Sequence, residues 1–222
     1  MATNKAVVQN PSNISFSDGD EVNNIAGKRG EQMVSQLTAE LYSVTYRGDM
    51  FHASTTPLGL AIPVYTATAP LVCLWNPIGS GVNLVLHKYT FAYTSGTSAY
   101  GAVGLMKETN TGSGIATGAV FSAFNEDTPT NGIVGGGKVS KALVSISGTN
   151  TLTTLGAASR WFMALGSINL EAITGTAHGV STASSHLHAV VIIPPGSAVW
   201  PACTKASVAL FAQTFSWTEI PV

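Results

Sequence analysis

The sequence predicts an all-β protein, namely an antiparallel, jelly-roll-like β-sandwich of about eight or nine strands that follows an extended N-terminal arm and one short amphipathic helix. From Met50 onward, short segments rich in Val, Ile, Thr, Phe and Tyr alternate with clusters of Gly, Pro, Asn and Ser. Such segments are typical of strands joined by tight turns. No helical pattern is interleaved with them, which favours antiparallel sheets over a βαβ arrangement.

The first 49 residues differ from the rest, and we treat them as a separate region (1–49) preceding the β body (50–222). Ten of the 21 charged residues lie among the first 50 positions. Residues 1–24 are polar and without periodicity, which predicts an extended arm. The next segment, Lys28–Tyr42, has apolar residues that repeat at helical spacing. We expect this helix to end before Gly48 and to pack its apolar stripe against the β body or a neighbour, through Met33, Val34, Leu37 and Leu41.

The strands are expected in nine segments, each bounded by turn residues. The turns include Asn76–Gly81, Asn131-Gly132 and Gly148–Asn150. The predicted strands are Met50–Ser54, Leu71–Asn76, Leu84–Tyr93, Tyr100–Met106, Ile115–Phe124, Lys138–Ser147, Arg160–Ile168, His186–Ile193 and Ser207–Thr218. The rigid turn Pro194-Pro195-Gly196 and the alternating final strand resemble the closing hairpin of a jelly roll.

Composition limits the function. The chain has 222 residues, a net charge of −1 and 9% charged residues, where soluble domains average about 25%. The balanced charge argues against nucleic-acid binding, which needs a basic excess. Apolar segments are too short for a membrane span, so no membrane partner is expected. Cys73 and Cys203 are too far apart in the chain for a disulfide framework or zinc motif. A charge-poor surface is typical of proteins that are covered by partners in an assembly.

Catalytic and cofactor motifs are not found, so we expect a non-enzymatic protein without a cofactor. The β body offers few carboxylates for paired acid–base chemistry and no G-x-S-x-G nucleophile motif. His186 and His188 are two residues apart on a predicted strand, which places both on one face. That spacing is a metal-binding geometry, but no acidic residue lies near, and a solvent-facing or interface pair is favoured.

Three segments resemble structural proteins of tailed bacteriophages. The first is Gly30–Leu37 with Tyr42, Thr45–Gly48 and Phe51. The second is Leu74–Leu84, and the third combines Pro194-Pro195-Gly196 with Ser216–Glu219. The resemblance covers most of the chain, but its motifs are structural rather than catalytic. It is closest to capsid cement or decoration proteins with jelly-roll bodies.

The resemblance implies a virion component on the capsid surface, assembled in the host cytoplasm. Its expected partners are the major capsid protein and further copies of itself, as a homotrimer or homodimer. Deletion of residues 1–45 is expected to leave a folded body that no longer binds capsids. Two alternatives stay open: a tail, fibre or adaptor protein that binds host glycans, and a cell-wall hydrolase. The second is disfavoured by the scarce acids.

Overall fold

A computed structural model describes residues 41–97, 101–109, 121–152, 160–168, 182–205 and 208–222. The chain forms two compact units, Met1–Ser43 and Val44–Val222. Every described strand belongs to the second unit. The division into 1–49 and 50–222 stays a prediction.

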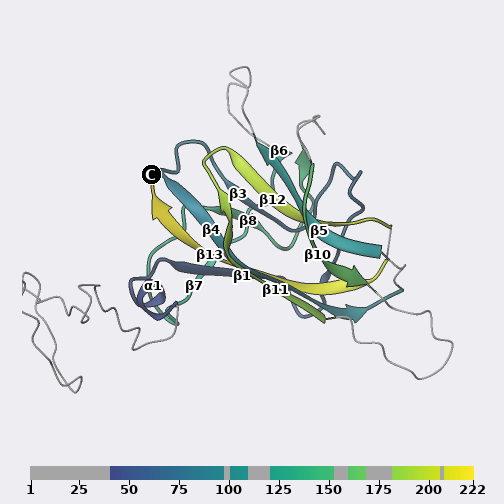
Figure 1. Ribbon diagram of the computed structural model, residues 1–222, viewed down its shortest axis with the longest axis horizontal. Coiled ribbons are helices and arrows are strands. Elements are labelled where there is room, and N and C mark those ends of the chain that lie inside the picture. The colour runs from purple at the N-terminus through teal and green to yellow at the C-terminus, as the bar shows by residue number, and fades with distance from the viewer. Residues whose placement is uncertain (1–40, 98–100, 110–120, 153–159, 169–181, 206–207) are drawn as a thin grey trace, which may run out of the picture. The chain divides into compact units, whose positions relative to one another are not determined.

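The second unit is an antiparallel β-sandwich, which confirms the predicted fold class. Its larger sheet has the strand order β11-β4-β13-β1-β7, with β2 also paired to β13. In Figure 1 the yellow β13 runs between the blue β4 and the darker β1. The strands of this six-stranded sheet are β1 (Met50–Ser54), β2 (Leu60–Ala61), β4 (Val82–Ser95), β7 (Thr130–Asn131), β11 (Thr182–Ile193) and β13 (Leu210–Pro221).

The facing sheet has five strands in the order β10-β5-β12-β3-β8. A two-stranded sheet of β6 and β9 forms a third element, and one helical turn, α1 (Tyr42–Tyr46), precedes β1. The remaining strands are β3 (Cys73–Asn76), β5 (Gly101–Thr109), β6 (Phe121–Ala123), β8 (Leu143–Ser145), β9 (Thr151–Leu152), β10 (Arg160–Ile168) and β12 (Ser197–Cys203).

The long strands pair between the two halves of the chain. The strands β1, β3, β4 and β5 of the first half pair antiparallel with β13, β12, β11 and β10 of the second half, respectively. Successive partners alternate between the two sheets. The path is therefore that of a long hairpin wound around the core.

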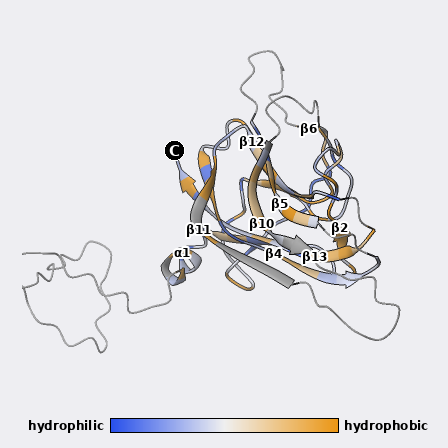
Figure 2. Ribbon diagram, turned by 45° about the vertical axis from the view of Figure 1, so that its right-hand side comes forward, coloured by the Kyte–Doolittle hydropathy of each residue, from blue (hydrophilic) through white to orange (hydrophobic). Residues whose placement is uncertain are grey.

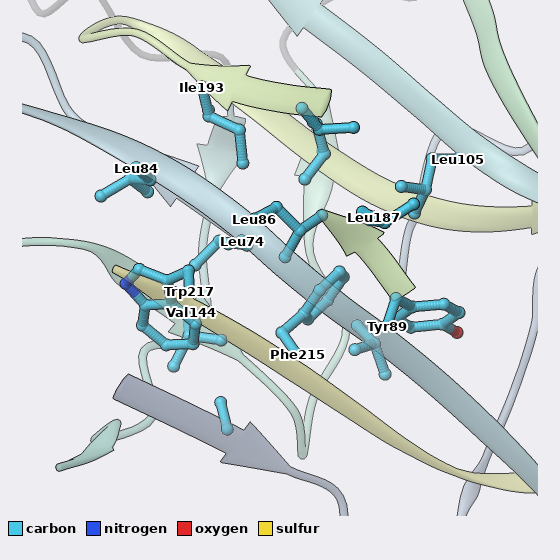
Figure 3. Close-up of a cluster of buried hydrophobic side chains, with 14 of the residues drawn as sticks. Leu74, Leu84, Leu86, Tyr89, Leu105, Val144, Leu187, Ile193, Phe215 and Trp217 are labelled. Atoms are coloured by element: carbon cyan, nitrogen blue, oxygen red, sulfur yellow. The ribbon is translucent and has the colours of Figure 1, made fainter. Parts of the chain in front are cut away.

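The main core fills the space between the sheets with aliphatic and aromatic side chains (Figure 3). The Trp217 ring stacks on Phe51 with 6.0 Å between centroids, and Phe215 lies 5.0 Å from Tyr89. The buried Tyr89 hydroxyl donates a hydrogen bond to Gln213 Oε1, so this polar group inside the core is paired. Burial also raises the pKa of Tyr89 well above its ordinary value.

A second, smaller core lies on the other face of the five-stranded sheet. There the rings of Trp75, Phe121 and Phe124 meet edge to face or tilted at 5.0 to 5.7 Å. Trp161 packs against the same cluster, and it fits because β5 has Gly104 beneath it: a Cβ on this glycine would stand 2.4 Å from the indole. The β6–β9 sheet thus covers a hydrophobic surface that the main sandwich leaves outside.

Most predicted strands are confirmed, and β1 and β10 have the predicted bounds. Strands β3, β4, β5, β8, β11 and β13 overlap their predicted segments. For the predicted strand Ile115–Phe124, the described part contains β6, and residues 115–120 lie outside the described residues.

Two strand predictions are wrong. The segment Lys138–Ala142 is not a strand, because the Glu219 carboxylate accepts hydrogen bonds from the backbone N–H groups of Lys141 and Ala142. The segment after Pro194-Pro195-Gly196 does not close a hairpin with the final strand. It enters β12, which belongs to the opposite sheet, so the turn is a crossover between the sheets.

The predicted helix is described only at its end, because residues 28–40 lie outside the described residues. Helical turn α1 covers Tyr42–Tyr46, so helical structure continues beyond Tyr42, the last residue of the predicted segment. It ends before Gly48, as expected from the sequence. The φ of Gly48 is 75°, which favours glycine, and its N–H donates a hydrogen bond to the Thr45 carbonyl.

Candidate partner-binding surface

The residues predicted to bind a partner are described only in part. Met33, Val34 and Leu37 lie outside the described residues. Leu41 is half-buried and directly precedes α1. The chain enters the sandwich through α1, and the surface of the second unit beside that entry presents further apolar side chains.

This surface, which we call the β7 corner, consists of Tyr46 and residues 132–139. The connection from β7 to β8 lies against the exit of α1. A Cβ on Gly132 would stand 3.0 Å from the Thr45 methyl group, and one on Gly48 would stand 3.2 Å from the Lys138 nitrogen. The two segments, which are about 90 positions apart in sequence, therefore form one continuous surface.

Polar contacts hold the β7 corner in place. The Asn131 amide donates hydrogen bonds to the carbonyls of Gly48 and Lys138, and its oxygen accepts one from the Ile133 N–H. The Lys138 ammonium pairs with Asp49. The loop is therefore tied to both ends of the α1–β1 junction.

One buried carboxylate anchors the end of the same loop. The Glu219 side chain, only 9% exposed, accepts hydrogen bonds from the Ser140 hydroxyl at 2.6 Å and from the N–H groups of Lys141 and Ala142. Three donors directed at one carboxylate satisfy it away from water. This contact fixes the end of the β7–β8 loop against β13, directly before β8 begins.

The β7 corner presents large apolar side chains to solvent. Val134 is 100% exposed, Val139 is 89% exposed and Tyr46 is 74% exposed. Single exposed apolar residues are ordinary, but a group held on a tied loop is typical of a protein–protein contact. Because hydrogen bonds already fix the loop, binding of a partner would cost little conformational entropy in the loop.

A shallow hollow adjoins the β7 corner. It has a volume of about 620 Å³ and is lined by His52, Thr130, Asn131 and residues 132–136. The backbone of glycine-rich residues forms much of its wall, and the imidazole of His52 forms one side. Its size and shallow shape fit a segment of a partner protein rather than a small enclosed ligand.

No protein-family model, curated protein or solved structure matches the chain. The interpretation of this surface therefore depends on its own chemistry.

The exposed face of the six-stranded sheet is polar beside the hollow, with hydroxyl and imidazole groups and with Lys88 opposite Ser216. The His52 imidazole bonds to the Ser216 hydroxyl at 2.9 Å, the Ser54 hydroxyl to that of Thr214 at 2.8 Å, and His87 to the Thr218 hydroxyl. Burial lowers the pKa of His52 below its ordinary 6.5, which favours the neutral ring. Hydroxyl and imidazole groups thus supply the polarity that charged residues give to other proteins.

The histidine pair weighed above as a metal site is placed only by its backbone. His186 and His188 lie in β11, with His186 opposite Lys88 of β4, and their side chains lie outside what the structure describes. Among the described side chains, no group of three or more His, Cys, Asp or Glu residues could hold a metal. Within the same part of the chain, no helix is long and apolar enough to cross a membrane.

Sequence reasoning missed the β7 corner altogether. The residues of the loop, Ile133-Val134-Gly135-Gly136-Gly137-Lys138-Val139, have the pattern of a turn followed by a strand. The sequence contains one signal of this surface. Two valines, Val134 and Val139, lie on either side of the glycine run in a segment that otherwise has the composition of a turn. Only the contact with α1 identifies them as part of one surface.

Proposed function

We propose that this chain is a non-enzymatic structural protein of a bacteriophage virion. In this proposal it binds the outside of the capsid and reinforces contacts between major capsid proteins, as cement or decoration proteins do. The observation that carries the proposal is the β7 corner: exposed apolar side chains held on a tied loop, at the point where the chain from the N-terminal region enters the sandwich.

The fold and the surface chemistry support the same proposal. The wound-hairpin pairing of β1, β3, β4 and β5 with β13, β12, β11 and β10 supports a jelly roll, an architecture common in viral capsids. A charge-poor surface rich in hydroxyl groups loses few ion–water contacts when a partner covers it. Fold does not fix function, so the surface carries the argument.

We also propose that the chain self-associates, as a homotrimer or homodimer. A subunit that contacts several capsid proteins gains avidity when copies of it are linked. The proposed location is the virion surface, after assembly in the host cytoplasm.

Capsid co-sedimentation tests the proposal. The triple variant Tyr46→Ser, Val134→Ser, Val139→Ser should bind capsids at least about tenfold more weakly, because the apolar contacts of the β7 corner are lost. The matched control is Leu58→Ser, Val208→Ser, which removes side chains that are 78% and 72% exposed beside the C-terminal end of β4, away from the β7 corner. Equal capsid binding by the triple variant and the control would contradict the proposal.

A truncation tests the role of the N-terminal region. The cut is best made after residue 40, because the Val44 and Thr45 carbonyls accept the hydrogen bonds that close the turn before β1, and the Thr45 methyl group lies against Gly132. We expect the truncated protein to keep the strand signature in circular dichroism and to lose capsid binding. Undiminished capsid binding by the truncated protein would contradict the role of the N-terminal region. Binding of the full chain to a host glycan array would favour the alternative, a tail, fibre or adaptor protein.

A further inference from the structure

A second hollow lies far from the β7 corner in the chain, between the ends of the two sheets. It has a volume of about 160 Å³ and combines residues of β5, β10, β11 and β12. Its principal lining residues are Lys107, Thr109, Phe162, Val191, Ile193 and Ser197. We call it the inter-sheet pocket.

The inner wall of the inter-sheet pocket is apolar. Val191 and Ile193 are each 1% exposed and belong to the main core, and Val199 of β12 lies beside them. The hollow is open to solvent on one side, and its volume is close to that of a cavity that accepts a benzene-sized guest. The pocket therefore has room for one small ring or a short alkyl chain.

The rim of the inter-sheet pocket has a single described cation. The Lys107 ammonium lies 5.2 Å from the centroid of the Phe162 ring, which holds it over the aromatic face. β5 carries hydrophobic colour in Figure 2, and Lys107 follows Met106 in the last third of the strand. The next residue, Glu108, is on the opposite face of β5 because successive side chains alternate.

Two hydroxyl groups complete the polar side of the rim. Ser197 Oγ lies 3.3 Å from Thr109 Oγ1, and both residues line the pocket. No carboxylate is among the described residues that line it. The Ser197 hydroxyl donates to Thr109, which leaves the Thr109 hydroxyl free to donate outward. An ammonium and this hydroxyl donor beside an apolar hollow complement one negatively charged, oxygen-bearing group with an apolar body.

We propose that the inter-sheet pocket binds a small monocarboxylate, aromatic or aliphatic, no larger than benzoate or hexanoate. The carboxylate accepts hydrogen bonds from the Lys107 ammonium and the Thr109 hydroxyl. The ring or alkyl chain lies against Phe162 and Ile192, the exposed apolar side chains of the lining, with the buried Val191 and Ile193 behind them. This inference is independent of the proposed capsid binding, because it uses no residue of the β7 corner.

Ligand-detected NMR and calorimetry with the full chain test this inference. The probes are benzoate, hexanoate and the neutral analogue benzyl alcohol. We expect benzoate to bind with a dissociation constant of about 1 mM, a value reasonable for so small a ligand, and benzyl alcohol at least about tenfold more weakly. Raising the salt concentration should weaken benzoate binding, because Lys107 is exposed and its charge is screened.

Three variants locate the binding. Lys107→Met keeps the aliphatic stem and removes the charge, so benzoate affinity should fall at least about tenfold. Thr109→Val should reduce it by a smaller factor, of about three. The matched control, Lys141→Met, removes another exposed lysine outside the pocket and should leave benzoate affinity unchanged.

Two results would overturn the inference. One is benzoate binding no tighter than benzyl alcohol to the native chain. The other is equal benzoate affinity of the Lys107→Met and Lys141→Met proteins. Lys107 is exposed and its replacement leaves the core intact, so neither result can be attributed to misfolding; the thermal unfolding of each variant checks this.

Discussion

Glu219 illustrates how a single buried side chain decides local structure. Its carboxylate receives two backbone N–H groups and one hydroxyl from residues 140–142, which therefore cannot join a β ladder. In sequence, the segment from Lys138 to Ser147 has the alternation of a strand, and nothing local indicates a carboxylate that is 77 positions away. This part of the fold follows from tertiary contact alone.

Replacing Glu219 should destabilise the protein. Glu219→Ala removes the acceptor of the Lys141 N–H and of the Ser140 hydroxyl, whereas the Ala142 N–H keeps Ser140 Oγ as an acceptor, and we expect the free energy of unfolding to fall by about 1–2 kcal/mol. Glu219→Gln keeps one acceptor oxygen and should lose less. Urea unfolding measures both, with the exposed Glu126→Gln as the control. A Glu219→Ala protein as stable as the control would refute the anchoring role.

His52 should make stability depend on pH. Its pKa in the folded state is lowered from 6.5 by burial, so the folded protein binds fewer protons than the unfolded chain just below pH 6.5. The stability that the neutral His52 ring contributes to the folded protein is therefore complete above pH 6.5. It is lost as the pH falls from 6.5 through the lowered pKa.

The His52 contribution is measured by comparison. Urea unfolding at about pH 7.5 and about pH 5.5 should show a larger loss of stability for the native chain than for His52→Gln. Glu108, whose pKa is raised by burial, acts in the opposite direction, but it is present in both proteins and cancels. The same loss in the two proteins would show that the His52 ring does not titrate as described.

At the scale of elements, the structure has two separate cores. The main core lies between the sheets, and the aromatic cluster of Trp75, Phe121 and Phe124 lies outside them, under the β6–β9 sheet. The two cores share strands β3, β5 and β12, whose alternate residues face one core or the other. The free cysteines are divided in the same way, since Cys73 belongs to the aromatic cluster and Cys203 to the main core.

Substitutions in the two cores should have different effects. Phe121→Ala should release the β6–β9 sheet, so that hydrogen exchange increases at Phe121–Ala123 and Thr151–Leu152 while β13 stays protected. The matched variant Phe215→Ala opens a cavity in the main core and should lower global stability by about 3–5 kcal/mol. Uniform exchange of all strands in Phe121→Ala would mean that the two cores unfold as one unit.

The elements that the sequence could predict are those with a strong local pattern. β4 and β13 have alternating apolar residues, β10 has a continuous apolar run, and these strands, like β1, have flanking turns; their positions are confirmed. β12 was missed because Pro201 interrupts it, although it is a central strand. The proline is tolerated there because β12 pairs with β3 only at Ser197–Val199, so β3 requires no N–H from position 201.

At the scale of the whole molecule, the fold class followed from composition and turn spacing, whereas the pairing of distant strands did not. β1 pairs with β13 across more than 160 positions, as in Ala53 opposite Phe215. Nothing local in either segment specifies the other. The candidate surface is equally nonlocal, because the β7 corner exists only where α1 meets a loop about 90 residues later.

The pairing of β1 with β13 has a mechanical consequence. The two strands are antiparallel, and Met50, the first residue of β1, lies opposite Thr218 near the end of β13. A tension that separates the chain before Met50 from the chain after Thr218 therefore acts at one end of the ladder and breaks its hydrogen bonds one after another. A load carried across the length of β4 and β13 acts on all their hydrogen bonds at once. The sandwich should accordingly be compliant when pulled apart at this end and stiff along its strands, the direction in which a protein that bridges neighbours would bear force.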